Sequence, residues 1–389
     1  MRFDMPLADE HRMLLDLVER FVEDELMPLE PAVLAREAAG GEAKLTREET
    51  DRIDARSREL GLWGLDAPID VGGSDLPQTA MVGVNIALGR TAVSYVFPPD
   101  SPNLRMLDAT VTAAQRERYL APYVRGETIS AIAISEPNAG ADPAAMTTRA
   151  VRTENGGWRI DGRKIWISRA DTADFAILMA VTDRDAGRKN GISAFLIDRD
   201  TPGVRIVGRI PMIGGTTTYE VAYEDVHLPA DALLGTEGAG FAPMQTRLAT
   251  RRLEIATWSI GAAERALAMM IAHAKERRVF GELLADRQSI QWWIADAVAQ
   301  IHAARLMAYD IARRMDVGED VSILVSAIKV TATETATSVI DHAMQAFGAM
   351  GMAKEMPLHL LAAQVRLMRI YDGPSEVHRW VVARAALRA

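Results

Sequence analysis

Apolar residues at helical spacing run through the first third of the chain, separated by acidic and basic residues. The pattern predicts helices over 8–38, 46–60, 76–89 and 112–124. The second of these begins at Thr46-Arg47-Glu48-Glu49, where a threonine cap precedes acidic residues in the first turn. The proline-rich stretch 97–102 breaks the pattern and predicts a loop. We therefore expect a helical domain over residues 1–128.

The hydrophobic period changes after residue 128, where short apolar runs alternate with turn signals such as Asn155-Gly156-Gly157 and Asp161-Gly162. Strands are predicted over 129–134, 158–160, 164–167, 175–181, 193–197, 204–207 and 219–223. Because no long helix separates these runs, we expect an antiparallel barrel or sandwich and not a parallel sheet. This central β domain is predicted over 129–236.

From Gly240 the helical period returns in long, alanine-rich amphipathic runs. Helices are predicted over 240–275, 287–315, 321–348, 357–370 and 380–387. Runs of this length and polarity predict a helical bundle over residues 237–389. The fold class is therefore α+β and mostly α, with a helical domain, a small β domain and a bundle in that order.

Composition excludes several classes of function. With 389 residues the chain is too long for one hydrophobic core. A net charge of -9 without a basic stripe argues against nucleic acid as a partner. The absence of cysteine and the scattered positions of 7 histidines argue against a metal site. The N-terminal residues do not resemble a signal peptide, and no apolar run is long enough to predict a membrane span.

Five stretches carry candidate chemistry, although each alone also fits a plain turn or helix end. They are Ser135–Asp142 after a strand, Trp166–Ser168 at a strand end, Arg277–Gly281 after a helix, Met344–Gly351, and Arg369–Arg379. In the last stretch, Gly373 and Pro374 break a helix, so Asp372 lies at a helix junction where its carboxylate can face a pocket. No dinucleotide, P-loop or hydrolase-elbow motif is present.

The five stretches, in this order and spacing, resemble the acyl-CoA dehydrogenase family. The motifs that carry the resemblance are SEPNAGAD, KIWIS, YEVAYEDVHLP, RRVFGELLADRQ, QAFGAMG and YDGPSEVHR, and it extends from the first helix to Arg384. The 99–103 loop, the 258–267 segment and the aspartate of the YDGP turn are similar to acyl-CoA dehydrogenase family members ten and eleven and their bacterial relatives. The resemblance implies a flavoenzyme with an N-terminal helical domain, a central antiparallel β domain and a C-terminal four-helix bundle. The FAD ring would lie between the β domain and the bundle.

The resemblance also implies roles for individual residues. Asp372 would be the catalytic base, and no metal is implied. The FAD would be bound by Ile134, Ser135, Ala141, Trp166, Ile167, Ser168, Arg277, Phe280, Gln288, Gln345, Gly348, Pro374 and Glu376, with those from Arg277 to Gly348 reaching it from a neighbouring subunit. Ala141, Arg252 and Gly373 would contact the acyl-CoA.

The chain departs from the family pattern at several of these positions. Ala141 replaces a serine, and Asp372 stands where most members have glutamate. A second subgroup carries its base at the position of Arg251, so no carboxylate is available there, and Glu254 is the alternative base. We expect Asp372 to lie in an apolar cleft over the flavin.

The implied activity is FAD-dependent α,β-dehydrogenation of an acyl-CoA to the trans-2-enoyl-CoA, as in fatty acid oxidation, with electrons passed to an electron-transferring flavoprotein. The alternatives are an acyl-CoA oxidase, a reductase or 1,4-dehydrogenase acting on a ring acyl-CoA, and a non-catalytic scaffold with this fold. A homo-oligomer is expected, as a dimer of dimers. The expected location is the cytoplasm of a bacterium or the mitochondrial matrix of a eukaryote, without secretion.

Overall fold

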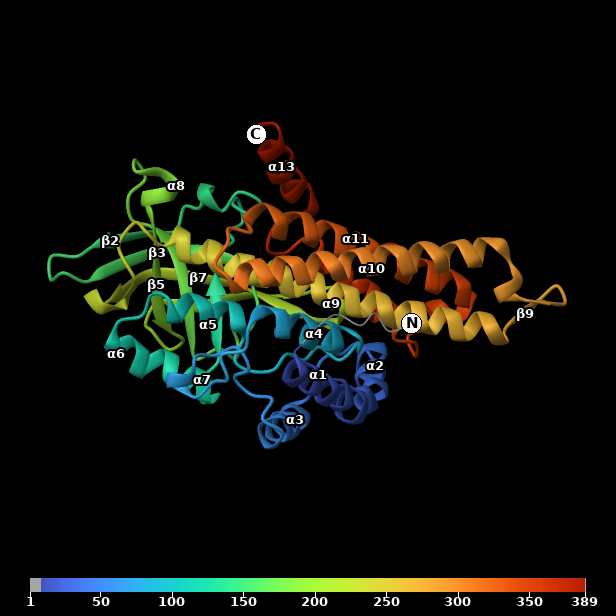
Figure 1. Ribbon diagram of the computed structural model, residues 1–389. Coiled ribbons are helices and arrows are strands. Elements are labelled where there is room, and N and C mark those ends of the chain that lie inside the picture. The colour runs from blue at the N-terminus through green and yellow to red at the C-terminus, as the bar shows by residue number, and fades with distance from the viewer. Residues whose placement is uncertain (1–7, 389) are drawn as a thin grey trace.

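A computed structural model describes residues 8–388, except for the side chains of Arg188 and Lys189. Helices at the N-terminal end pack beside a central sheet and under one end of a long helical bundle (Figure 1). The predicted order of helices, sheet and bundle is confirmed. One hydrophobic core runs through the N-terminal helices and the bundle, so these two parts are packed together and not merely linked.

The N-terminal part contains seven helices among the described residues. They are α1 (Asp9–Phe21), α2 (Glu30–Ala38), α3 (Arg47–Glu59), α4 (Gln78–Gly89), α5 (Ser101–Asp108), α6 (Ala113–Gln115) and α7 (Ala121–Arg125). A π turn and a 3-10 turn join α1 to α2, so the helix predicted over 8–38 is almost continuous. The Thr46 hydroxyl accepts from the Glu49 N–H at 3.2 Å and the Glu49 carboxylate accepts from the Thr46 N–H at 2.8 Å. The predicted helix start is therefore a capping box.

The loop predicted over 97–102 is shorter than expected, since α5 begins at Ser101. Pro102 lies in the first turn of this helix, where its missing N–H would have no helical partner and its fixed φ fits. The prediction treated Pro102 as a helix breaker, so it was wrong about where the loop ends. The early start of α5 matters because it fixes Asp100 and Asn103 on the side of the cleft described below.

The central sheet has eight strands among the described residues. They are β1 (Ser130–Ala133), β2 (Arg149–Arg152), β3 (Trp158–Ile167), β4 (Phe175–Val181), β5 (Ile192–Asp198), β6 (Val204–Pro211), β7 (Thr217–Leu228) and β8 (Leu233–Leu234). Their order is β6-β7-β3-β2-β4-β5-β8, with β1 beside β4. Most pairs are antiparallel as predicted, but β1 and β4 run parallel from Ser130↔Phe175 to Ala133↔Leu178, and Arg149 of β2 also pairs in parallel with Val181. The chain reaches β4 from β1 only after the β2–β3 hairpin, which allows the parallel pairing.

β3 corrects a second prediction, because the runs 158–160 and 164–167 form one strand. Asp161-Gly162 makes a shift of register against β7 and not a turn. A Cβ on Gly162 would lie 2.3 Å from the Thr148 hydroxyl oxygen, so only glycine allows this approach. The strand predicted over 175–181 is β4, which has a core on each face: Ile177 and Met179 face the α5–α7 side, and Leu178 faces the other core.

Within the described residues the bundle consists of five helices. They are α9 (Phe241–Glu276), α10 (Gln288–Asp316), α11 (Ser322–Phe347), α12 (Leu358–Met368) and α13 (Ser375–Ala386). The hairpin of β9 (Arg278–Val279) and β10 (Glu282–Leu283) joins α9 to α10 at the end of the bundle remote from the sheet (Figure 1). By length and composition the segment 322–352 could cross a membrane, but 56% of its most apolar window is buried in the protein. It is packed as a core helix.

α4 and α9 meet through two glycines. A Cβ on Gly261 would lie 2.1 Å from the Ile86 carbonyl oxygen, and one on Gly89 would lie 2.3 Å from the Trp258 carbonyl oxygen. The two backbones therefore approach more closely than any side chain would permit. This contact fixes the part of α9 that precedes it against the N-terminal domain, and that part carries most of the charged residues of the candidate site.

Candidate active site

The turn between α12 and α13 is held through three consecutive carbonyl oxygens. The Lys329 ammonium donates to the Tyr371 and Gly373 carbonyls at 2.6 Å each. The Asp372 carbonyl accepts from Arg252 Nε at 3.1 Å and contacts His378 Nε2 at 3.2 Å. The backbone of the turn is thus fixed from α9, α11 and α13 together. Among the described residues the Asp372 N–H has no hydrogen-bond acceptor, so this donor remains available.

Two buried groups at this turn have shifted pKa values. Burial, followed by the nearby charges of Arg252 and Lys329, lowers the pKa of His378 to about 3. The imidazole is therefore neutral at physiological pH, and its contact with the Asp372 carbonyl requires the proton on Nε2. Burial also lowers the pKa of Lys329 to about 8, which leaves this ammonium largely charged near pH 7.

The Asp372 carboxylate lies against a cation and not in the apolar surroundings expected from the sequence. Arg247 Nη1 is 3.0 Å from Asp372 Oδ1, and the two side chains are 6% and 16% exposed. Arg247 Nε also donates to Asn103 Oδ1 at 2.9 Å, and the Asn103 amide donates to the Ser130 hydroxyl at 2.9 Å. A chain of polar contacts therefore joins the base position to α5 and to the start of β1. The expectation of an apolar cleft was wrong because α9 turns its charged face to this turn.

A second charged group lies one helical turn further along α9. Arg251 pairs with Asp100 and approaches Glu254 Oε2 at 2.8 Å. Burial alone would raise the pKa of Asp100, but Arg251 and neighbouring cations lower it to about 2. For Glu254 burial prevails and raises the pKa to about 8, in spite of Arg251. Near pH 7 only a minor fraction of this carboxyl is ionised, and in that form it is paired with Arg251, which counts against Glu254 as the alternative base.

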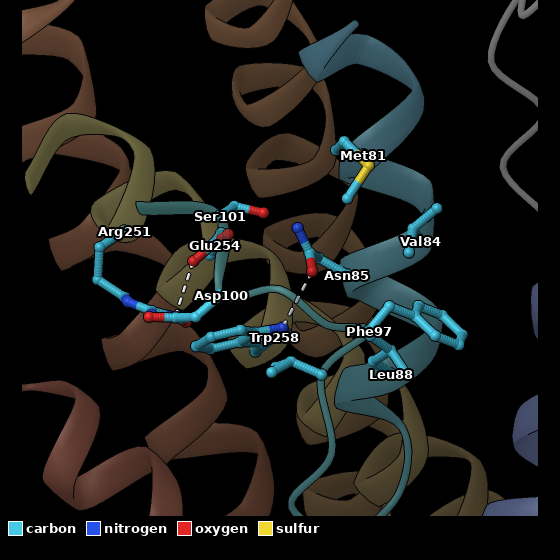
Figure 2. A pocket seen from close by; sticks show the side chains of 11 residues that line it. Met81, Val84, Asn85, Leu88, Phe97, Asp100, Ser101, Arg251, Glu254 and Trp258 are labelled. Atoms are coloured by element: carbon cyan, nitrogen blue, oxygen red, sulfur yellow. Dashed lines mark hydrogen bonds and ion pairs between the residues drawn. The ribbon is translucent and has the colours of Figure 1, made fainter. Parts of the chain in front are cut away.

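These groups border a small hollow with one charged and one apolar wall. Figure 2 shows Asp100, Arg251 and Glu254 on one side and apolar side chains on the other. The apolar wall consists of Met81, Val84, Leu88, Val96, Phe97 and Trp258. The cavity volume open to water centres is about 10 Å³, room for roughly one water molecule. A long alkyl chain could enter only if these side chains moved.

The predicted flavin side lies where the loop after β1 meets the end of β3. The buried Lys164 ammonium donates to Glu136 Oε1 at 2.9 Å and to the Ile134 carbonyl at 2.8 Å. The Ile165 N–H donates to the Ser135 carbonyl at 3.0 Å. The structure therefore brings Ile134 and Ser135 beside β3, as the sequence predicted. Ala141 and Ser168 are exposed, whereas Ile167 is buried.

Trp166 fits the edge of a flat cofactor. Its indole is 50% exposed at the end of a strand, and its backbone has a φ of 64°. Asp372 and Phe280 also have positive φ values, at 52° and 51°. Such conformations cost about 1–3 kcal/mol in a residue other than glycine and cluster at functional sites. Three predicted site residues thus share this uncommon backbone geometry, which supports their assignment to binding surfaces.

The remaining predicted cofactor residues lie at the far end of the bundle. Arg277 and Phe280 adjoin the β9–β10 hairpin, and the rings of His273 and Phe347 stack with centroids 4.1 Å apart, joining this end to that of α11. Arg277, Phe280, Gln288, Gln345 and Gly348 are all exposed, and Phe280 is 100% exposed. Along α9 they are about 45 Å from Arg247, at 1.5 Å per residue. One chain therefore presents two separate sets of predicted cofactor residues.

Sequence reasoning missed four residues that hold the Asp372 turn: Arg247, Asn103, Lys329 and His378. The sequence could have indicated a role for Lys329, because it is a lone cation in an otherwise apolar helical stretch. The sequence could also have indicated a role for Arg247, because its spacing places it on one helix face with other residues of the site. Arg247, Arg251, Glu254 and Trp258 recur at spacings of four, three and four. The sequence pattern gave no comparable indication for His378 or Asn103. Pro374 and Glu376 directly follow the turn, as predicted, with Pro374 at the cap of α13. The described residues contain no cluster of metal-ligating side chains.

Comparison with known proteins gives matches along the whole described chain. Three family models match: acyl-CoA dehydrogenase N-terminal domain over residues 8–127, middle domain over 131–226 and C-terminal domain over 238–387. The chain is 39% identical to (R)-benzylsuccinyl-CoA dehydrogenase of Thauera aromatica, over 99% of this chain and 97% of that protein. It is 30% identical to the 3-(aryl)acrylate reductase of Clostridium sporogenes, over 99% and 100%. The solved structure of butyryl-CoA dehydrogenase from Megasphaera elsdenii matches with a TM-score of 0.87 and 30% identity, covering 99% of this chain and 100% of that one.

Proposed function

Because this chain belongs to the acyl-CoA dehydrogenase family, whose members are FAD-dependent oxidoreductases, we propose that it dehydrogenates an acyl-CoA thioester between Cα and Cβ. The observation that carries the proposal is the Asp372 turn. It offers a carboxylate and a backbone N–H side by side, while its three carbonyl oxygens are held by buried donors. This is the arrangement that removal of an α-proton from a thioester requires.

Asp372 is proposed to act in two ways. Its carboxylate takes the α-proton, and its N–H donates to the thioester oxygen, where negative charge develops as the proton leaves. Arg247 orients the carboxylate through the 3.0 Å contact, and Arg252 and Lys329 prevent the turn from shifting. Fixed donors of this kind stabilise the enolate because they need no reorganisation during the reaction.

Members of this family bind FAD, and the residues present fit it. Exposed Trp166 and Ser168 at the end of β3 would hold the flavin ring, with Ser135 beside them. Once bound, FAD accepts the β-hydride that leaves with the α-proton, so the substrate loses two electrons and becomes the trans-2-enoyl-CoA. Ala141, Pro374 and Glu376 are proposed to complete the surface around the ring, and Gly373 and Arg252 the surface around the thioester.

The second set of cofactor residues favours a homo-oligomer. Arg277, Gln288, Gln345 and Gly348 are too far along the bundle to serve the same FAD as Trp166. We propose that they bind the pyrophosphate and adenosine of a neighbouring subunit's FAD, in a dimer of dimers. Phe280 is fully exposed beside these residues, so all of them are open to contact with a neighbouring subunit's FAD. An electron-transferring flavoprotein is the proposed electron acceptor.

The hollow and the relatives favour a compact acyl group. The relatives from Thauera aromatica and Clostridium sporogenes are named for substrates with an aromatic ring. The apolar wall of the hollow includes Phe97 and Trp258, against which a ring could pack if the side chains of the wall moved apart to admit it. A ring-bearing acyl-CoA is therefore the second candidate substrate class, and the reductase name of one relative makes the reverse direction a second candidate reaction.

The test begins with the purified protein, which should be yellow and carry FAD in a ratio close to one per chain. A panel of acyl-CoA esters is then mixed with it anaerobically, and bleaching of the flavin absorbance is followed. Bleaching by at least one ester, with the enoyl-CoA recovered by mass spectrometry, supports the proposal. A protein that binds FAD but is bleached by none of the esters, while its chemically reduced form transfers electrons to an enoyl-CoA, would assign the reductase reaction instead. Oxygen consumption during turnover would reveal an oxidase.

A further inference from the structure

We propose that the acyl group of the substrate carries a second carboxylate, and that Arg247 and Arg251 bind this carboxylate beside Asp372. The inference rests on the proposed function, since it names the substrate class of the same cleft. It is carried by the arrangement and the balance of charges that line the cleft, which an uncharged acyl chain would not need.

The two guanidinium groups are neighbours on one face of α9. Arg247, Arg251 and Glu254 follow one another at intervals of four and three residues, so their side chains point to the same side of the helix. Arg247 uses Nε for Asn103 and Nη1 for Asp372. Among the described residues its Nη2 makes no hydrogen bond to protein, so one donor of the fork is left for a ligand. Arg251 borders the hollow itself.

The cleft holds more positive than negative charge. Arg247, Arg252 and Lys329 contact the Asp372 turn, and Arg251 borders the hollow beside it. The carboxylates paired with these cations are Asp372 and Asp100. Glu254 adds little negative charge, because burial raises its pKa to about 8. Buried charge without a counter-charge is costly, so this excess favours binding of an anion.

Two of the four cations already have another role. Lys329 and Arg252 donate to the carbonyl oxygens of the Asp372 turn, so their position is explained by the turn alone. Arg247 and Arg251 have no such backbone partners. A carboxylate on the acyl group would accept a hydrogen bond from Arg247 Nη2 and would be attracted by the positive charge of Arg251. Guanidinium groups suit this task, because their planar donors match the geometry of a carboxylate.

A general stabilisation of the enolate is the competing explanation for the positive charge. It would act on every acyl-CoA alike, whereas a carboxylate receptor discriminates between substrates. The ratio of rates for two esters that differ only at the end of the acyl group therefore separates the two explanations. Succinyl-CoA with butyryl-CoA, and glutaryl-CoA with valeryl-CoA, are such pairs, because a carboxylate replaces a methyl group in each.

The experiment measures kcat/KM for both pairs with the FAD-loaded wild-type protein and with Arg247→Gln and Arg251→Gln. We expect the wild type to prefer at least one carboxylated ester by about 10²–10³-fold, the effect of truncating one partner of a buried charge pair. Arg247→Gln should abolish most of the preference. It should slow the methyl ester as well, because Arg247 orients Asp372, but by a smaller factor than the carboxylated ester. Arg265→Gln is the matched control, because Arg265 is on the same helix about 21 Å beyond Arg251 and pairs with Glu30.

Arg251→Gln could unfold the protein, since it leaves Asp100 without its partner. The double variant Asp100→Asn/Arg251→Gln removes both charges and should retain the fold while losing preference. A second measurement does not depend on turnover: binding of S-(3-carboxypropyl)-CoA and S-butyl-CoA, two unreactive thioethers, by calorimetry. Preference for the carboxylated thioether that depends on Arg247 would support the inference even if no ester is oxidised and the proposed function fails.

Equal kcat/KM for both members of each pair, together with equal binding of the two thioethers, would overturn the inference and leave the proposed dehydrogenation intact. A uniform loss of rate for all esters in Arg247→Gln, with the ratio unchanged, would likewise overturn it. Arg247 would then be a positioning residue for Asp372 only.

Discussion

The two halves of α9 use the same backbone for opposite purposes. The first half, up to Glu254, carries the buried Arg247, Arg251 and Arg252 toward the Asp372 turn. The second half, from Ile255, presents Gly261 and a series of alanines to α4 and the rest of the bundle. The first half concentrates charge where it is costly to bury, and the second obtains close packing from the smallest side chains.

The difference teaches that the site depends on the packing that follows it. The charged half could not keep its side chains desolvated unless the glycine contact held α9 firmly against α4. Substitutions in the first half should therefore change activity more than stability, and substitutions in the second half should do the reverse. Four predictions test this division: two at the Asp372 turn that the first half contacts, one in the second half and one where the halves meet.

The largest effect is expected from Asp372→Asn. Loss of the proposed base should slow flavin bleaching by the best substrate about 10³–10⁴-fold, while FAD content and the unfolding temperature stay close to those of the wild type. Stopped-flow absorbance gives the rate. Asp372→Glu is the companion variant and should retain part of the activity if the cleft accepts one more methylene. Bleaching of the Asn variant at nearly the wild-type rate would place the base elsewhere, and Glu254→Gln would be measured next.

The next effect in size is expected from Lys329→Met, which removes the donor to the Tyr371 and Gly373 carbonyls. A displacement of the turn by about 1 Å should lower kcat about 10²-fold. Steady-state kinetics would show it as a fall in kcat larger than any change in KM. Lys354→Met, which removes a surface ion pair with Glu37, is the control and should leave kcat unchanged. An unaltered kcat in Lys329→Met would show that the turn is held by Arg252 and His378 alone.

In the second half of α9, Gly261→Ala should reverse this pattern. Its Cβ would lie 2.1 Å from the Ile86 carbonyl, and the forced separation of α4 and α9 should lower the free energy of unfolding by about 1–3 kcal/mol. Chemical denaturation measures it. Gly208→Ala is the control, because its Cβ would lie 3.4 Å from the nearest atoms and φ is not positive there. Equal stability of both variants would refute the role given to the glycine contact.

The smallest effect concerns Glu254, where the two halves meet. Burial raises its pKa to about 8 in the folded protein, from an ordinary value of 4.5. Between these values the folded state binds more protons than the unfolded state, so the free energy of unfolding falls as pH rises through this window. Glu254→Gln should remove this slope. The stability of the variant relative to the wild type should therefore be greater above the window than below it. Denaturation at pH values on either side is the measurement, and parallel pH profiles would show that folding does not raise the pKa of Glu254.

Much of the fold followed from the sequence because its signals are local. Helical periodicity, the Thr46 cap and the apolar run of β4 need only neighbouring residues, and these elements were predicted. The start of α5 at Ser101 and the continuity of β3 through Gly162 were not, because each depends on a contact with a distant segment. The close approach of Thr148 makes Gly162 necessary, and no residue near Gly162 in the sequence indicates this contact.

For the site, the sequence by itself determined the position of Asp372 at a helix junction, the glycine after it and the motifs that carry the family resemblance. Only the tertiary structure decided what surrounds that carboxylate. Arg247, Lys329 and His378 come from three different helices and meet at the turn only after α9, α11 and α13 have packed. The charge and burial around this carboxylate depend on segments that are far apart in the chain. The local patterns that predict helices carry no information about such distant segments.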